Sequence, residues 1–153
     1  MRATLPTLFR RPGPFTVIAR VINNRPTSIA HIQTDGSFKN QPYILSRTSL
    51  IMKTSENQQY SLMNTYLNHK NSTESEWRSV LDGIEYSIKK NEPSIELEND
   101  NLGVMSSLIN RRKPHGYLQD YYLYIFDRIK EMEWVGIRWI PREMNKSDRL
   151  FRI

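Results

Sequence analysis

The chain has 153 residues, a length typical of a single domain with a well-formed hydrophobic core. Cysteine is absent, which excludes a disulfide framework and thiolate metal sites and suits a reducing compartment. No apolar run approaches the length that spans a bilayer. We therefore expect an intracellular protein, in the cytoplasm or in an organelle such as the mitochondrion, neither secreted nor membrane-bound. The net charge of +6 favours a polyanionic partner.

Most of this charge lies at the N-terminus. Five of the 22 basic residues and none of the 16 acidic ones precede Asp35, so the remainder of the chain is nearly neutral. Four of the eight prolines also lie within the first 26 residues. We predict a basic, proline- and arginine-rich extension over residues 1–29 and a folded domain over residues 30–153.

Three interpretations of the extension stay open. Arginines without acidic neighbours suit a tether for nucleic acid, a ribonucleoprotein or a larger complex. The acid-free, arginine-rich composition also resembles an organellar presequence, although prolines disfavour the amphipathic helix of such a signal. Phe15–Ile22 is apolar and β-branched enough to add an edge strand to the domain instead.

The segment from Ala30 to about Leu67 has β character. Apolar and polar residues alternate before Asp35, and the stretches Tyr43–Met52 and Tyr60–Leu67 are rich in β-formers. A short polar segment, Lys53–Gln59, separates the last two. Three consecutive strands with short connections predict an antiparallel meander.

The second half alternates helices with strands. Thr73 and Glu76 have the spacing of a capping box, and an apolar stripe at helical period follows until Asn91. The remaining predicted elements are a strand over Ile95–Leu97, a helix over Leu102–Ile109, a helix over Tyr117–Glu131 and a strand over Trp134–Ile140. The predicted fold class is α/β: a five-stranded mixed sheet of three antiparallel strands, then two joined through helices, flanked by helices.

Four acidic residues sit where predicted elements begin or end. Each has an ordinary explanation: Asp35 in a hairpin turn, Glu76 in the capping box, Asp100 as a helix N-cap, and Asp148 as a solvated acid near the terminus. Four separate explanations account poorly for the combined pattern, because the predicted topology brings all four carboxylates to one sheet edge. Carboxylate ligands without histidine or cysteine suit two Mg²⁺ ions, with Mn²⁺ as a substitute. Two such ions support hydrolysis of a phosphodiester.

From about Ala30 to Ile153 the chain resembles the ribonuclease H family. The matching segments are TDGSF, STESEW, IELENDN and WIPREMNKSD, which hold Asp35, Glu76, Asp100 and Asp148 in that order. The resemblance implies the RNase H-like fold and an endonuclease that hydrolyses the RNA strand of an RNA–DNA hybrid. It also implies that Asp35 bridges both metal ions, that Glu76 and Asp100 complete one site, and that Asp148 completes the other.

Further residues become candidates for binding nucleic acid: Gly36, Ser37, Ser72, Thr73 and Asn101 within these segments, and Arg111, Arg112 and Lys113 in a basic loop after the predicted helix over Leu102–Ile109. Two interpretations of the three basic residues are equally open. They bind phosphates of the DNA strand, or they are positive charges at the end of the preceding helix, where the helix macrodipole favours them. The chain departs from the family pattern at Ser72 and Thr73, where two asparagines are common, and at Leu102, where a polar residue is common.

Two rival functions remain. An RNase H-fold subunit that binds RNA or a ribonucleoprotein without catalysis is favoured by these departures and by the arginine-rich extension. A DNA-resolving or transposase-like nuclease uses similar metal chemistry on the same fold. A cleavage assay on hybrid and duplex substrates separates them.

Overall fold

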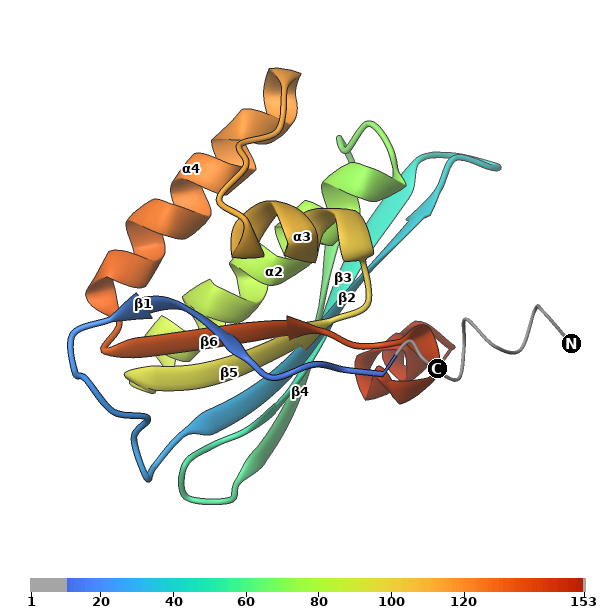
Figure 1. The fold of residues 1–153 in the computed structure, drawn as a ribbon. Helices are drawn as coiled ribbons and strands as arrows, with labels where there is room; N and C mark the ends of the chain where they lie inside the picture. The colour runs from blue at the N-terminus through green and yellow to red at the C-terminus, as the bar shows by residue number, and fades with distance from the viewer. Residues whose placement is uncertain (1–10, 153) are drawn as a thin grey trace, which may run out of the picture.

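The computed structural model describes residues 11–152 of the chain (Figure 1). The first part of the predicted extension, with Arg2 and Arg10, and the terminal Ile153 lie outside the described residues. Six strands form one mixed sheet in the order β1-β6-β5-β2-β3-β4. The strands are β1 (Thr16–Arg20), β2 (Ala30–Lys39), β3 (Leu45–Lys53), β4 (Gln59–Tyr66), β5 (Ser94–Asn99) and β6 (Trp134–Trp139).

The predicted α/β class and mixed sheet are confirmed. The meander β2–β3–β4 is antiparallel, β5 lies parallel to both β2 and β6, and β1 lies antiparallel to β6. The predicted number of five strands was wrong. The sixth, β1, lies in the range assigned to the extension, and its partner β6 is more than a hundred residues further along, so nothing local marks the pairing.

Three α-helices, α2 (Ser72–Lys89), α3 (Leu102–Ile109) and α4 (Gln119–Arg128), pack on one face of the sheet (Figure 1). The core between them and the sheet includes Ile32, Leu50, Val80, Ile84, Leu97, Met105, Ile125 and Ile137. Four short 3₁₀ helices complete the fold: η1 (Gly116–Leu118), η2 (Ile129–Glu131), η3 (Arg142–Met144) and η4 (Lys146–Arg152). No helix among residues 11–152 is long and apolar enough to cross a membrane.

The start of α2 corrects the predicted capping box. Asn71 is the N-cap, and its side-chain oxygen accepts a hydrogen bond from the N–H of Glu74 at 2.9 Å. The Glu74 carboxylate in turn accepts from the N–H of Lys70 at 2.7 Å. Because these two side chains satisfy the end of the helix, Glu76 is free to point elsewhere.

The predicted helix over Tyr117–Glu131 is not continuous. A 3₁₀ turn, η1, opens it, α4 follows, and a second 3₁₀ turn, η2, closes it. Gly116, in the left-handed region at φ 69°, separates this unit from the preceding loop.

The N-terminal segment is tied to the sheet by several contacts. Ile18 is only 4 % exposed and joins the core, and its carbonyl accepts a hydrogen bond from Arg111 at 2.8 Å. Arg25 donates two hydrogen bonds, each 2.9 Å long, to the buried Glu96. A domain boundary near residue 30 stays a prediction, and of the three interpretations these contacts favour the added edge strand.

We expect Ile18→Ala to lower the free energy of unfolding by about 2–4 kcal/mol, because it removes a buried side chain from the sheet–helix interface. The matched control is Val21→Ala: Val21 is 74 % exposed, and we expect a change within about 0.5 kcal/mol. Denaturant unfolding of both variants measures the difference. Equal stability of Ile18→Ala and the wild type would show that the segment is a tether instead.

Candidate active site

The sheet register places two of the predicted carboxylates side by side. β2 and β5 run parallel, and the last pair in register is Thr34 with Asn99. Asp35, the next residue of β2, and Asp100, the first residue after β5, both lie where the two strands separate. Neighbouring strands lie about 4.8 Å apart, close enough for carboxylates at matched positions to share a cation.

Glu76 joins them because α2 crosses very close to β2. A Cβ atom added to Gly36 would lie 2.6 Å from the backbone carbon and oxygen of Ser75, closer than any real contact. At this crossing the N–H of Gly36 donates to Glu76 Oε1 at 2.8 Å and to Asp35 Oδ1 at 2.9 Å. Any side chain at residue 36 would separate the helix from the strand and move Glu76 away.

Three carboxylates therefore converge. Oxygen atoms of Asp35, Glu76 and Asp100 all lie within 4.8 Å of one another, in an arrangement that could hold a metal ion. The fourth predicted acid, Asp148, lies in η4, close enough to Asp35 to raise the pKa of that carboxyl, but it does not belong to this trio. Its Oδ2 accepts a 2.6 Å hydrogen bond from Arg152.

Burial and mutual repulsion dominate the electrostatics of this cluster. Burial, followed by the negative charges of Glu76, Asp100 and Asp148, raises the pKa of Asp35 to about 9. Burial likewise raises the pKa of Glu76 to about 7, with repulsion from Asp100 as the next cause. The pKa of Asp100 is also raised by burial, although the nearby positive charge of Arg142 opposes the shift. A bound cation would relieve this repulsion, so the donor set fits a hard divalent ion.

Two asparagines that the sequence gave no reason to select hold the cluster in place. Asn99 donates from its amide to the carbonyl and hydroxyl of Thr34, at 3.0 Å each, and to Ser79 of α2 at 3.2 Å. Asn145 donates to the same Thr34 carbonyl at 2.8 Å, and its side-chain oxygen accepts from Ser147. The residue before Asp35 is thus linked to β5, to α2 and to the segment that carries Asp148.

The polar residues predicted to bind nucleic acid surround this cluster. Ser72 and Thr73 are exposed in the first turn of α2, and Ser37 follows Gly36 on β2. Asn101 is the N-cap of α3, where its side-chain oxygen accepts from the Val104 N–H at 2.9 Å, and its side chain opposes the rise in the pKa of Glu76. Their role in binding stays a prediction.

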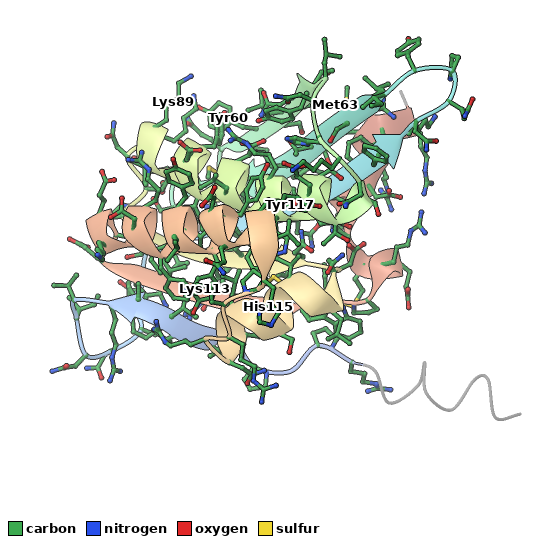
Figure 2. The ribbon with its side chains drawn as sticks, turned by 90° about the horizontal axis from the view of Figure 1, so that it is seen from above. Tyr60, Met63, Lys89, Lys113, His115 and Tyr117 are labelled. Atoms are coloured by element: carbon green, nitrogen blue, oxygen red, sulfur yellow. The ribbon has the colours of Figure 1, made fainter. Side chains whose placement is uncertain are left out.

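The three predicted basic residues, Arg111, Arg112 and Lys113, differ in their surroundings. Arg111 is engaged within the protein: it bonds to the Ile18 carbonyl, and its guanidinium lies 4.9 Å from the ring centre of Phe126. Arg112 and Lys113 are exposed, and Figure 2 shows Lys113 and His115 on the loop that joins α3 to α4. Three residues were predicted to contact phosphates. Of these, Arg112 and Lys113 are the two whose side chains make no hydrogen bond, ion pair or ring contact within the described chain, so they remain available for a ligand.

The histidines do not contribute to the cluster. His69 is buried, stacked 4.7 Å from the ring of Tyr66, with Nδ1 2.6 Å from the Ser46 hydroxyl. Burial lowers the pKa of His69. His31 lies 3.7 Å from Glu96 on the far side of the sheet from the helices, and His115 is exposed.

Comparison with solved structures places the fold. RNase H1 from the halophilic archaeon Halobacterium salinarum superposes with a TM-score of 0.70 at 16% identity, over 79% of this chain and 92% of that one. The N-terminal RNase H domain of a Mycobacterium tuberculosis protein gives 0.71 at 17% identity, over 81% and 91%. LC11-RNase H1, solved with an RNA/DNA hybrid, gives 0.67 at 15% identity, over 79% and 92%. No curated protein sequence matches the chain.

These likenesses define an α/β protein with the RNase H-like fold, as the motifs predicted. By sequence the chain belongs to the reverse transcriptase-like family, which it matches over residues 33–149. That match covers all four predicted carboxylates.

We expect Gly36→Ala to destabilise the protein by about 1–3 kcal/mol or more, because the new methyl group meets the backbone of α2. Gly13→Ala is the matched control, since a Cβ there meets nothing within 4 Å. Thermal melts of both variants measure the cost. If Gly36→Ala were as stable as the wild type, the close crossing of α2 and β2 would be refuted.

In a chelator, Asp35→Asn should raise the melting temperature on the order of 5 °C at alkaline pH. The folded-state pKa of Asp35 is about 9, far above its ordinary value near 4, so its stabilising contribution is complete below about pH 4 and lost as the pH rises through 9. Asparagine does not titrate, so its advantage should grow from pH 5 to pH 9. Asp127→Asn, at an exposed acid, is the control. Parallel curves for wild type and Asp35→Asn would contradict the raised pKa.

Proposed function

We propose that the chain is a metal-dependent endonuclease of the ribonuclease H type, which hydrolyses the RNA strand of RNA–DNA hybrids. The observation that carries the proposal is the convergence of Asp35, Glu76 and Asp100 from two parallel strands and a helix onto one point. Such a cluster destabilises the fold unless a cation neutralises it, so its presence favours a functional role.

We assign Asp35 as the ligand shared by two divalent ions, Mg²⁺ or Mn²⁺. Glu76 and Asp100 would complete one ion site, and Asp148, which lies near enough to raise the pKa of Asp35, would contribute to the other. When bound, the ions supply Lewis-acid activation of water and neutralise charge on the phosphate. Asp148 is paired with Arg152, so that arginine would have to release it.

The protein itself holds these oxygens in position. The Gly36 N–H orients both Asp35 and Glu76. Asn99 and Asn145 fix the backbone directly before Asp35. Because hydrogen bonds with the main chain fix the Asp35 and Glu76 carboxylates and the backbone before Asp35, the site is preorganised for charge that develops on a bound phosphate.

The hybrid is the proposed substrate because relatives of the same fold bind it. LC11-RNase H1 and a foamy-virus protease–reverse transcriptase were both solved with an RNA/DNA hybrid. Recognition would rest on 2′-hydroxyls and helix shape, with Ser72 and Thr73 at the start of α2 facing the cleaved strand and Arg112 and Lys113 near its partner. We place this activity inside the cell, and docking of residues 1–29 to a ribonucleoprotein is part of the same proposal.

A second function remains in view: an RNase H-fold subunit that binds RNA or a ribonucleoprotein without cutting it. The observation in its favour is the Asp148–Arg152 pair, which leaves only three carboxylates in the tight cluster. The two functions differ in whether the chain cleaves a bound hybrid at all.

The purified chain should cut the RNA strand of a hybrid in Mg²⁺ or Mn²⁺, irrespective of base sequence. Asp35→Asn should lower the cleavage rate by roughly a thousandfold or more, because one ligand serves both ions. Gel analysis of end-labelled hybrid and DNA duplex measures both, with Asp127→Asn as the control. Tight hybrid binding without cleavage would support the non-catalytic subunit, and equal cutting of DNA duplex the resolvase-like enzyme.

A further inference from the structure

The two edges of the sheet are built differently. The edge strand β1 has five residues, its register with β6 shifts between Val17 and Ala19, and Arg111 covers the carbonyl of Ile18. A short strand, a bulge and a covering charge are the means by which proteins block pairing at a sheet edge. The β1 edge is therefore protected against addition of another strand.

The opposite edge, β4, has none of these features within the described chain. Its eight residues, Gln59–Tyr66, include no charge, no proline and no glycine. Its register with β3 runs without a shift from Lys53–Gln59 to Ser46–Tyr66. Among residues 11–152 the strand pairs with β3 alone, so the N–H and C=O groups of every second residue point outward along a straight edge.

Apolar side chains accompany this open edge. Met63, at the middle of the strand, is 42 % exposed, and Leu67, directly after it, is 71 % exposed. Leu62 and Tyr60 face the helices and are half-buried at this edge. The centre of the Tyr60 ring lies 6.4 Å from that of Tyr86 and 4.2 Å from the Lys90 ammonium. In Figure 2, Tyr60 and Met63 lie along the margin of the molecule that β4 forms.

We infer that β4 is a dimerisation edge, which pairs antiparallel with β4 of a second copy of this chain to give one continuous twelve-stranded sheet. A twofold axis perpendicular to the sheet keeps the helices of both copies on the same face. Each residue must then oppose a residue from the same face of the partner strand, that is, one an even number of positions away.

The sequence of β4 is self-complementary about Met63 under this constraint. Met63 of one copy lies opposite Met63 of the other. On either side of it Ser61 lies opposite Thr65 and Tyr60 opposite Tyr66, and the twofold axis repeats each of these pairs. Aromatic pairs and serine–threonine pairs are favourable cross-strand neighbours, and no like charges meet anywhere along the strand. The absence of charged residues within β4 itself therefore fits pairing with a second copy of the same strand.

Sedimentation velocity on the full chain over a concentration series tests the inference. The wild type should shift from monomer to dimer, and Met63→Lys should raise the dissociation constant on the order of tenfold or more, because two lysines would oppose each other. The matched control is Leu123→Lys, on the exposed face of α4, where Leu123 is 50 % exposed; it should dimerise as the wild type does. An equimolar mixture of Met63→Lys and Met63→Glu should recover the dimer.

A second measurement uses the absence of cysteine from the chain. Met63→Cys should form a covalent dimer on mild oxidation, whereas Leu123→Cys should not. Circular dichroism confirms that each variant is folded, and none of these residues belongs to the proposed active site. A wild type that stays monomeric at all concentrations would overturn the inference in favour of a strand from another protein. A dimer indifferent to Met63→Lys would place the interface elsewhere.

Discussion

The structure depends on holding three carboxylates together against their own repulsion. Asp35, Glu76 and Asp100 have oxygen atoms within 4.8 Å of one another, and burial and neighbouring negative charge raise the pKa of each. In the absence of a cation this arrangement costs stability, so the surrounding fold must compensate for it. The close crossing of α2 over β2, possible only because residue 36 is glycine, is what brings the helix carboxylate into the cluster.

The compensation comes from neutral hydrogen bonds rather than from ion pairs. Asn99 and Asn145 converge on the carbonyl of Thr34, and Asn99 also reaches Ser79 on α2. Buried amides of this kind fix geometry without neutralising the carboxylates, so the charge remains available for a cation. The ion pairs among the described residues lie elsewhere, apart from Arg152 with Asp148 at the rim.

The sequence predicted features that local pattern controls. Alternating β-formers marked β2, β3 and β4, and the helical period marked α2. Of the four carboxylates predicted to meet, Asp35, Glu76 and Asp100 converge, although Asp35 lies within β2 rather than after a strand, and Asp148 lies outside the trio. The predictions failed where a residue's partner is distant or where several neighbours compete for one role. Tertiary contacts determine the pairing of β1 with β6, the hydrogen bond from Arg111 to Ile18 and the roles of Asn99 and Asn145. At the start of α2 several adjacent polar residues can cap the helix, and Asn71 does so instead of Thr73.

The central claim is that the acidic cluster binds divalent cations, and proton release on binding tests it most directly. Because the pKa of Asp35 is about 9 and that of Glu76 about 7, the metal-free cluster holds at least one proton at neutral pH, which a cation must displace. Titration calorimetry with Mn²⁺ at pH 7, in two buffers of different ionisation enthalpy, counts the protons released. The account predicts saturable binding with release of about one proton, lost in Asp35→Asn. Binding without proton release, or no binding, would contradict it.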